Sequence, residues 1–315
     1  MQTTTRCRQT TTTMAYRLDH ERGSLRGFRR VVGEQIDKAV IALADPMPPP
    51  TAILEARKSI KKLRALLMLC EPRLGRKPWR QLDRQLRDIG RSLAGRRDND
   101  VIAERLAEIA AADTSGTAGT GKRQQNPYCR RLQRVLKSTA QRANADTTNV
   151  ATDPATARQS LTELIATLPD DHQLAPTRID LLATILKTRR RARAAMHLAA
   201  GADDSELLHD WRKLALRHAR HLQLLSSARG DALAARAGEI RDMARLIGME
   251  HDFHLLAAWL ATQAPERTQL AHQRELLRRI EHRRLAARKA ALIAGAAIFA
   301  ERRRAADTRS RSHCR

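Results

Sequence analysis

Two stretches of the sequence carry lysine and arginine at spacings that place them along one side of an α-helix. The first spans residues 55–69 and the second spans residues 207–225. At about 100° per residue, the apolar side chains of each stretch fall on one arc and the cations on the other. Arginine chelates phosphate or carboxylate oxygens through its planar fork, and lysine acts as a mobile point charge. The two stretches therefore predict a site that binds an anion.

The candidate anion-binding residues lie on these cationic arcs and on helices near them. On the arcs they are Arg57, Lys58, Lys61, Lys62, Arg64, His209, Arg212, Lys213, Arg217 and Arg220. Two pairs of arginines, each one helical turn apart, join them: Arg87 with Arg91 and Arg241 with Arg245. These two pairs could instead form salt bridges with Asp88, Asp242 or another helix.

An ordinary solvated surface is the alternative interpretation of each cationic arc. Such a surface would normally mix both signs of charge, because neighbouring like charges on a helix repel by about 0.2–0.5 kcal/mol per pair. Two helices with the same bias favour a shared anion over two solvated surfaces.

Histidines in the second half of the chain fall into different environments. His209 lies in the cationic arc, and both His209 and His251 could donate to a phosphate oxygen or add positive charge. His218 lies in the apolar arc and is expected to be a hydrogen-bonded core residue. His251 and His254 share a helix face and could bind a metal, but no third strong ligand accompanies them. We therefore predict no metal site and no cofactor.

Helices must position these residues. Apolar residues recur at three- and four-residue steps, and no period-two stretch rich in β-branched residues predicts a strand. The expected helices are 23–44, 51–70, 79–93, one that follows Asp98 and carries Val101, Leu106 and Ile109, then 128–145, 155–168, 176–200, a second cationic helix capped by Ser205, 231–247 and 265–298. We therefore predict an all-α protein.

The segment 112–126 is rich in threonine and glycine and is predicted to be a flexible linker. It contains Gly116, Gly121 and Lys122 at the spacing of a P-loop. However, Arg123 stands where a P-loop needs serine or threonine, and no strand precedes the segment. We therefore favour a linker over a nucleotide site.

The second half of the chain repeats the first. Arg212 follows Arg57 by 155 residues, and Asp252 follows Asp98 by 154 residues. One inserted residue reconciles these separations, so we predict an internal duplication. Asp98 and Asp252 are expected to cap the next helix or to orient neighbouring cations.

The predicted division of the chain follows from the repeat. We expect one helical-bundle repeat at residues 14–172 and a second at residues 173–300. Residues 1–13 and 301–315 are expected to be disordered tails, the latter strongly basic.

Charge composition points to the class of partner. The chain has 59 lysines and arginines against 34 aspartates and glutamates, a net charge of +25. This excess predicts nucleic acid, an anionic membrane or another polyanion as the partner. Only 3% of residues are aromatic, which disfavours a single-stranded nucleic-acid binder that stacks bases on rings.

The expected cellular location rests on three features that are not found in the sequence. The longest apolar run, residues 290–300, is about half as long as a membrane span requires. No signal peptide is visible, and the four cysteines form no pair typical of a disulfide framework or a zinc ribbon. These features predict a soluble protein of the reducing cytoplasm.

The sequence resembles the CHAD domain, the conserved-histidine α-helical domain, from Met14 to about Ile298. The segments that carry the resemblance are 56–64, 95–101, 208–213 and 247–252. The resemblance implies two helical bundles related by a pseudo-twofold axis, with a basic central channel that binds inorganic polyphosphate. It also implies targeting to polyphosphate granules in some members. The halves differ, however, since Leu54 stands at the position of His209 and Leu216 at that of Lys61.

Residue pattern and resemblance together predict a non-enzymatic protein that binds polyphosphate through a channel of lysine, arginine and histidine. The alternative is a basic helical protein that binds the phosphate backbone of nucleic acids without reading bases. A phosphohydrolase would need a metal site or a positioned nucleophile, and the sequence indicates neither.

Overall fold

The computed structural model describes most of the chain. The described residues are 16–18, 27–93, 97–112, 127–145, 154–168, 175–226 and 232–300. The two expected tails and the P-loop-like segment 116–123 lie outside them. Within the described ranges the chain is helical and contains no β-strand, so the predicted all-α class is confirmed.

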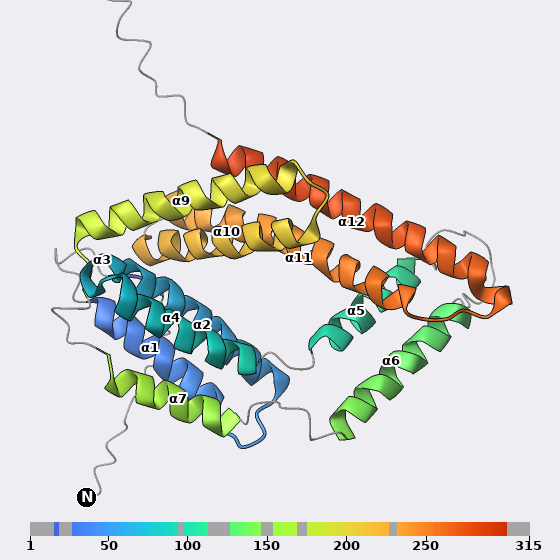
Figure 1. Cartoon of the computed structure of the whole chain (residues 1–315), viewed down its shortest axis with the longest axis horizontal. Helices are drawn as coiled ribbons and strands as arrows, with labels where there is room; N and C mark the ends of the chain where they lie inside the picture. Colours follow the sequence, from blue (N-terminus) through green and yellow to red (C-terminus); the bar gives the residue numbers. More distant parts are fainter. Residues whose placement is uncertain are drawn as a thin grey trace, which may run out of the picture.

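The helices pack as bundles around shared buried side chains (Figure 1). They are α1 (Gly27–Ala42), α2 (Pro50–Leu69), α3 (Glu71–Leu74), α4 (Arg76–Ser92), α5 (Arg97–Ala112), α6 (Pro127–Ala145), α7 (Pro154–Ala166), α9 (Arg178–Ala200), α10 (Ser205–Leu225), α11 (Ala232–Ala261) and α12 (Leu270–Phe299). A 3-10 turn, η2 (Arg267–Gln269), precedes α12.

Local sequence signals set several helix ends. Pro50 opens α2, because proline fits the first helical turn, where its missing N–H is not needed. Thr177 and Asp180 form a capping box that opens α9, with Thr177 Oγ1 accepting from the Asp180 N–H at 3.1 Å and Asp180 Oδ2 accepting from the Thr177 N–H at 2.9 Å. After α2 ends at Leu69, Glu71 and Pro72 begin the short α3.

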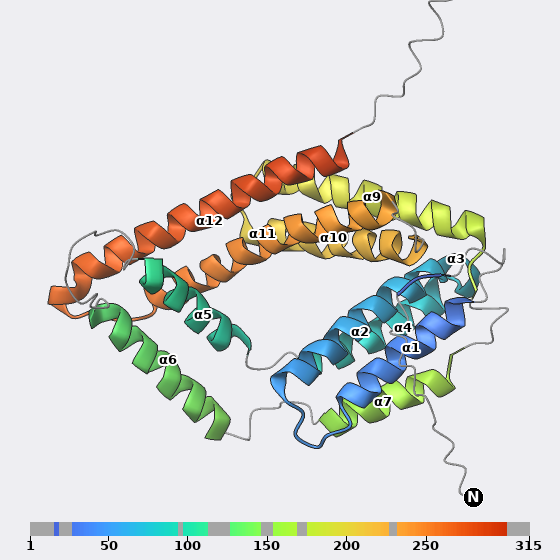
Figure 2. The ribbon, with the colours of Figure 1, turned by 180° about the vertical axis from the view of Figure 1, so that it is seen from behind.

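Three clusters of buried side chains form the cores of the described part of the chain. The first joins α1, α2, α4 and α7, and includes Phe28, Leu66, Leu86 and Leu161. The second joins α9, α10, α11 and α12, and includes Met196, Trp211, Ile240 and Ala291. The third joins α5 and α6 to α11 and α12, and includes Leu106, Leu132, Phe253 and Ile280. The long helices α11 and α12 therefore belong to two cores each; they lie side by side, with α12 along the upper edge in both views (Figures 1 and 2).

The length of α11 corrects one prediction. The sequence predicted a helix over 231–247, whereas α11 continues to Ala261. The continuation has a physical reason: Phe253, Leu256 and Leu260 keep the helical spacing of apolar residues and are buried in the third core. The residues after Gly248 therefore share one rigid helix with those before it.

The start of α10 corrects a second prediction. Asp204, not Ser205, is the N-cap, because its side chain accepts a hydrogen bond from the Glu206 N–H at 2.8 Å. Ser205 is the first helical residue and is buried. Its hydroxyl donates to Glu250 Oε2 at 2.8 Å, which ties the start of α10 to α11.

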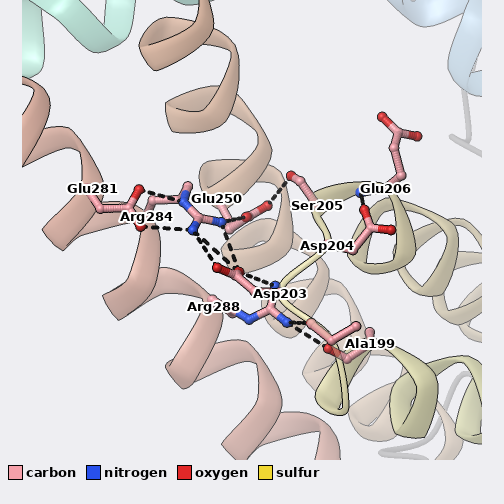
Figure 3. A network of polar contacts seen from close by, with 10 residues as sticks. Ala199, Asp203, Asp204, Ser205, Glu206, Glu250, Glu281, Arg284 and Arg288 are labelled. Atoms are coloured by element: carbon pink, nitrogen blue, oxygen red, sulfur yellow. Dashed lines mark hydrogen bonds and ion pairs between the residues drawn. The ribbon is translucent and has the colours of Figure 1, made fainter.

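A network of charged side chains fixes the α9–α10 connection to α11 and α12 (Figure 3). Arg284 donates to Glu250 at 2.9 Å, to Glu281 at 2.8 Å and to Asp203 at 3.3 Å. Arg288 donates to the Ala199 carbonyl at 2.8 Å. The Glu250 carboxylate is fully buried, and such a charge is tolerated only when it is paired and hydrogen-bonded. The network therefore sets how the start of α10 meets the middle of α11.

Gly295 allows α12 to approach α10 closely. Trp211 of α10 is fully buried, and a Cβ atom at position 295 would lie 2.4 Å from its ring. Real Cβ atoms do not come so close to ring carbons, so the packing of Trp211 requires glycine here.

Gly295→Ala is expected to lower the free energy of unfolding by about 1–3 kcal/mol, because the added methyl group overpacks the second core. Urea denaturation measures the change. The matched control is Gly238→Ala in α11, where a Cβ meets nothing within 4 Å. That substitution should raise stability by up to about 1 kcal/mol through helix propensity. Equal effects of the two substitutions would contradict the close packing at Trp211.

Candidate anion-binding site

The two cationic helices, α2 and α10, meet at one hydrogen bond. His221 of α10 is fully buried, and its Nε2 lies 2.9 Å from the Ala65 carbonyl oxygen of α2. The carbonyl can only accept, so Nε2 carries the proton and donates. Burial lowers the pKa of His221 to about 3, which keeps the ring neutral. This bond places the cations of α10 next to those of α2.

Cations from both helices gather at this junction. Arg217 and Arg220 of α10 and Lys62 of α2 are half-buried. Burial, together with the charges of Arg217 and Arg212, lowers the pKa of Arg220 to about 10. Burial also lowers the pKa values of Arg217 and Lys62, with Arg64 adding to the effect on Arg217 and Lys38 to that on Lys62. The protonated side chains are thus partly desolvated and repel one another.

Arg212 extends this group of cations toward α11. Its Nε donates to the Ala244 carbonyl at 2.8 Å, and its guanidinium lies against Gly248. A Cβ at position 248 would stand 3.3 Å from Arg212 Nη2, which is a tight contact. The glycine therefore lets the Arg212 side chain lie across α11.

His209 and His251 face each other next to Arg212. Their ring centroids are 4.8 Å apart, and burial together with the charge of Lys213 lowers the pKa of His209 to about 4. The Nδ1 atom of each ring is buried and has no hydrogen-bond partner among the described residues. The His209 ring is therefore neutral at pH 7.

Asp83 of α4 is the carboxylate at the centre of the first half of the site. It accepts from Arg64 Nε at 2.8 Å, from Arg64 Nη2 at 3.1 Å and from Arg87 Nη2 at 2.8 Å. Burial alone would raise the pKa of the Asp83 carboxyl, but the hydrogen bonds from Arg64 and Arg87, with the nearby charge of Arg217, hold it below its ordinary value. Asp83 therefore links cations of α2, α4 and α10.

The remaining candidate residues lie outside this group or at its edge. Arg57 is half-buried and Lys61 is exposed on α2. The exposed residues with an acidic or amide partner are Lys58 with Glu55 (2.6 Å), Arg91 with Asp88 (3.8 Å), Lys213 with Asp210 (2.9 Å), Arg241 with Gln223 (2.7 Å) and Arg245 with Asp242. For Arg91 and Arg245 the structure thus contains the salt bridges that the sequence left open.

The prediction made for the two aligned aspartates, Asp98 and Asp252, can be compared with the structure only at Asp252. Asp252 lies inside α11 and caps no helix. It instead accepts a hydrogen bond from Arg105 Nε at 3.3 Å and so orients a neighbouring cation. This was the second of the two roles predicted for it. The side chain of Asp98 lies outside the described part of the chain.

His218 occupies the core position predicted for it. It is buried, and its Nδ1 lies 3.2 Å from the hydroxyl of Thr188. His221 shares the same hydroxyl at 3.4 Å, so Thr188 anchors both rings of α10 to α9.

Sequence reasoning missed two contributors to the site. Asp83 stands four residues before Arg87, a spacing typical of helix ion pairs, and this was the available signal. Tyr16 gave no such signal. Its hydroxyl donates to the Lys62 carbonyl at 3.2 Å, and the nearby Leu18 N–H donates to the Leu224 carbonyl at 2.8 Å. Residues 16–18 therefore bridge α2 and α10.

Neither a metal-binding cluster nor a membrane-spanning helix occurs among the described residues. No cluster of three or more histidine, cysteine, aspartate or glutamate side chains is arranged there to hold a metal ion. None of the helices described is both long and apolar enough to cross a bilayer.

The fold and site define an all-helical protein in which two helices hold cations side by side. Residues 34–261, well over half of the chain, match the family model of the CHAD domain. The chain belongs to the CHAD domain family. No curated protein and no solved structure matches it.

The buried histidines predict acid sensitivity. Burial lowers the pKa values of His218 and His221 from 6.5 to about 4 and about 3. Below pH 6.5 the unfolded chain therefore binds protons that the folded protein does not. The free energy of unfolding that the neutral rings contribute is fully present above this pH and decreases toward pH 4. Each of these two histidines should change the free energy of unfolding by up to about 1.4 kcal/mol per pH unit.

Melting temperatures measured across this range test the linkage. His221→Gln is expected to melt lower than wild type at pH 7 but to lose less stability on acidification. His254→Gln, which alters an exposed residue, should keep the wild-type slope. An unchanged slope in His221→Gln would contradict the assignment of a buried neutral ring.

Proposed function

We propose that the protein binds inorganic polyphosphate, without catalysing its chemistry, at the cations gathered between α2 and α10. The observation that carries this proposal is the crowding of Arg217, Arg220 and Lys62, whose pKa values are lowered by burial. A bound anion would relieve the repulsion among these groups. Membership of the CHAD domain family supports the same class of ligand.

The chemistry of polyphosphate suits such a site. It is a flexible chain with about one negative charge per phosphate and no bases, so it needs cations and not stacking rings. Arg212 and Arg217 offer planar forks to phosphate oxygens, and Lys62 offers a point charge. Binding should be driven largely by release of counterions, as in nucleic-acid complexes, and should weaken steeply with salt.

We further infer that α2 and α10 are equivalent helices of a duplicated unit and line one basic channel. Support comes from their similar cationic arcs, 155 residues apart, and from their contact at Ala65 and His221. Leu54, at the position that corresponds to His209, gives the first half no histidine. The two halves would therefore grip the anion differently.

A protein with this activity would be cytoplasmic and would gather at polyphosphate granules. The competing proposal is binding to the phosphate backbone of nucleic acids, which the net charge of +25 also favours. The two proposals differ in what the ligand must offer. Polyphosphate satisfies the site with charge alone, whereas a duplex must also fit its shape.

A competition assay with fluorescent long-chain polyphosphate compares the ligands directly. Unlabelled polyphosphate is expected to displace it at lower concentration than duplex DNA, single-stranded RNA or heparin of equal charge. Equal or weaker affinity for polyphosphate would contradict the proposal. Replacing Arg302, Arg303 and Arg304 by glutamine should reduce nucleic-acid binding and leave polyphosphate binding unchanged. Phosphate release with added Mg²⁺ or Mn²⁺ would contradict the non-enzymatic role.

Single substitutions rank the contacts. Arg212→Gln is expected to weaken polyphosphate binding by about tenfold or more, because it removes a charge-assisted hydrogen bond. His209→Ala should weaken binding less, since the His209 ring is neutral at pH 7. Arg91→Gln removes one positive charge from an exposed salt bridge and serves as the control. A larger effect of His209→Ala than of Arg212→Gln would show that the histidine carries the contact.

A further inference from the structure

Asp83 is an acidic residue placed where the proposed function requires cations. Its side chain is 10% exposed, and it accepts three hydrogen bonds of 2.8, 3.1 and 2.8 Å from Arg64 and Arg87. Arg217 of α10 lies near enough to influence its charge. The carboxylate therefore occupies the space between cations of three helices.

The two arginines bind the Asp83 carboxylate with the same donor arrangement that arginines use to bind a phosphate group. Arg64 presents the Nε and Nη2 edge of its guanidinium to the two carboxylate oxygens, and this edge fits two oxygens of a phosphate equally well. Arg87 adds a donor from the other side. A phosphate group of the polyphosphate chain in the same place could offer its two non-bridging oxygens to the same partners.

We propose that Asp83 is a built-in counter-anion that occupies one phosphate position of the site and is displaced from Arg64 and Arg87 when polyphosphate binds. This inference rests on the proposed function. In the ligand-free protein the carboxylate offsets repulsion between Arg64 and Arg217. On binding, the ligand must compete with it, so Asp83 stabilises the empty fold and limits the affinity.

The second half of the chain supports treating Arg64 and Asp83 as a unit. At the separations of 155 and 154 residues, Ala219 corresponds to Arg64 and Ala237 to Asp83. Both alanines are buried in the second core. The cation and its counter-anion are thus absent together, as expected if each requires the other in the absence of ligand.

Asp83→Asn tests the proposal with Asp88→Asn as a matched control. Both substitutions remove one negative charge from α4, but Asp88 is exposed and pairs with Arg91 at 3.8 Å. Binding of long-chain polyphosphate to the full chain is measured by titration calorimetry. Asp83→Asn is expected to bind about three- to tenfold more tightly than Asp88→Asn, with a lower melting temperature before ligand is added. Affinity equal to or below that of Asp88→Asn would overturn the inference.

A double variant, Arg64→Gln with Asp83→Asn, covers the case in which Asp83→Asn alone does not fold. Arg64→Gln leaves Asp83 in the site without its main partner and is expected to weaken binding. Adding Asp83→Asn to Arg64→Gln removes both charges, as in the second half of the chain, and should restore affinity to near the wild-type value. If the double variant binds no better than Arg64→Gln, Asp83 does not compete with the ligand.

The outcomes separate this inference from the proposed function. Wild-type protein that fails to bind polyphosphate would overturn both. Wild-type protein that binds, together with an Asp83→Asn variant no tighter than Asp88→Asn, would overturn only the role of Asp83.

Discussion

Repulsion among cations held between α2 and α10 is the constraint on which the rest of the structure depends. Arg217, Arg220 and Lys62 are partly removed from water there, and each has a lowered pKa as a result. Apolar packing in the first and second cores holds the two helices in place from outside. The free energy of core packing thus keeps like charges close, and an anion would recover part of the cost.

The third core extends this arrangement to the histidines. Because α11 is continuous, Gly248 and His251 belong to the same rigid helix as the residues of the second core. Glu250, between them in sequence, is buried and held by Arg284. The surface that meets Arg212 and His209 is therefore positioned by packing at both ends of α11.

Much of the fold follows from local patterns in the sequence, whereas the site depends on contacts between distant residues. Apolar spacing predicted nearly every helix described, and it placed His218 in the core. It could not predict that Arg220, on the cationic arc, is half-buried, because that depends on where α2 packs. It also could not place the Asp83 carboxylate between Arg64 and Arg87, since Arg64 is on another helix. The helical spacing of Phe253, Leu256 and Leu260 could have predicted that α11 continues past Gly248, but not that these residues pack against α5 and α6 in a third core.

A crystal structure of the protein with bound polyphosphate tests the central claim most directly. The account predicts phosphate groups within hydrogen-bonding distance of Lys62 or Arg64 from α2 and of Arg212 or Arg217 from α10 in the same complex. Phosphate groups found only at exposed arginines such as Arg241 and Arg245 would contradict it.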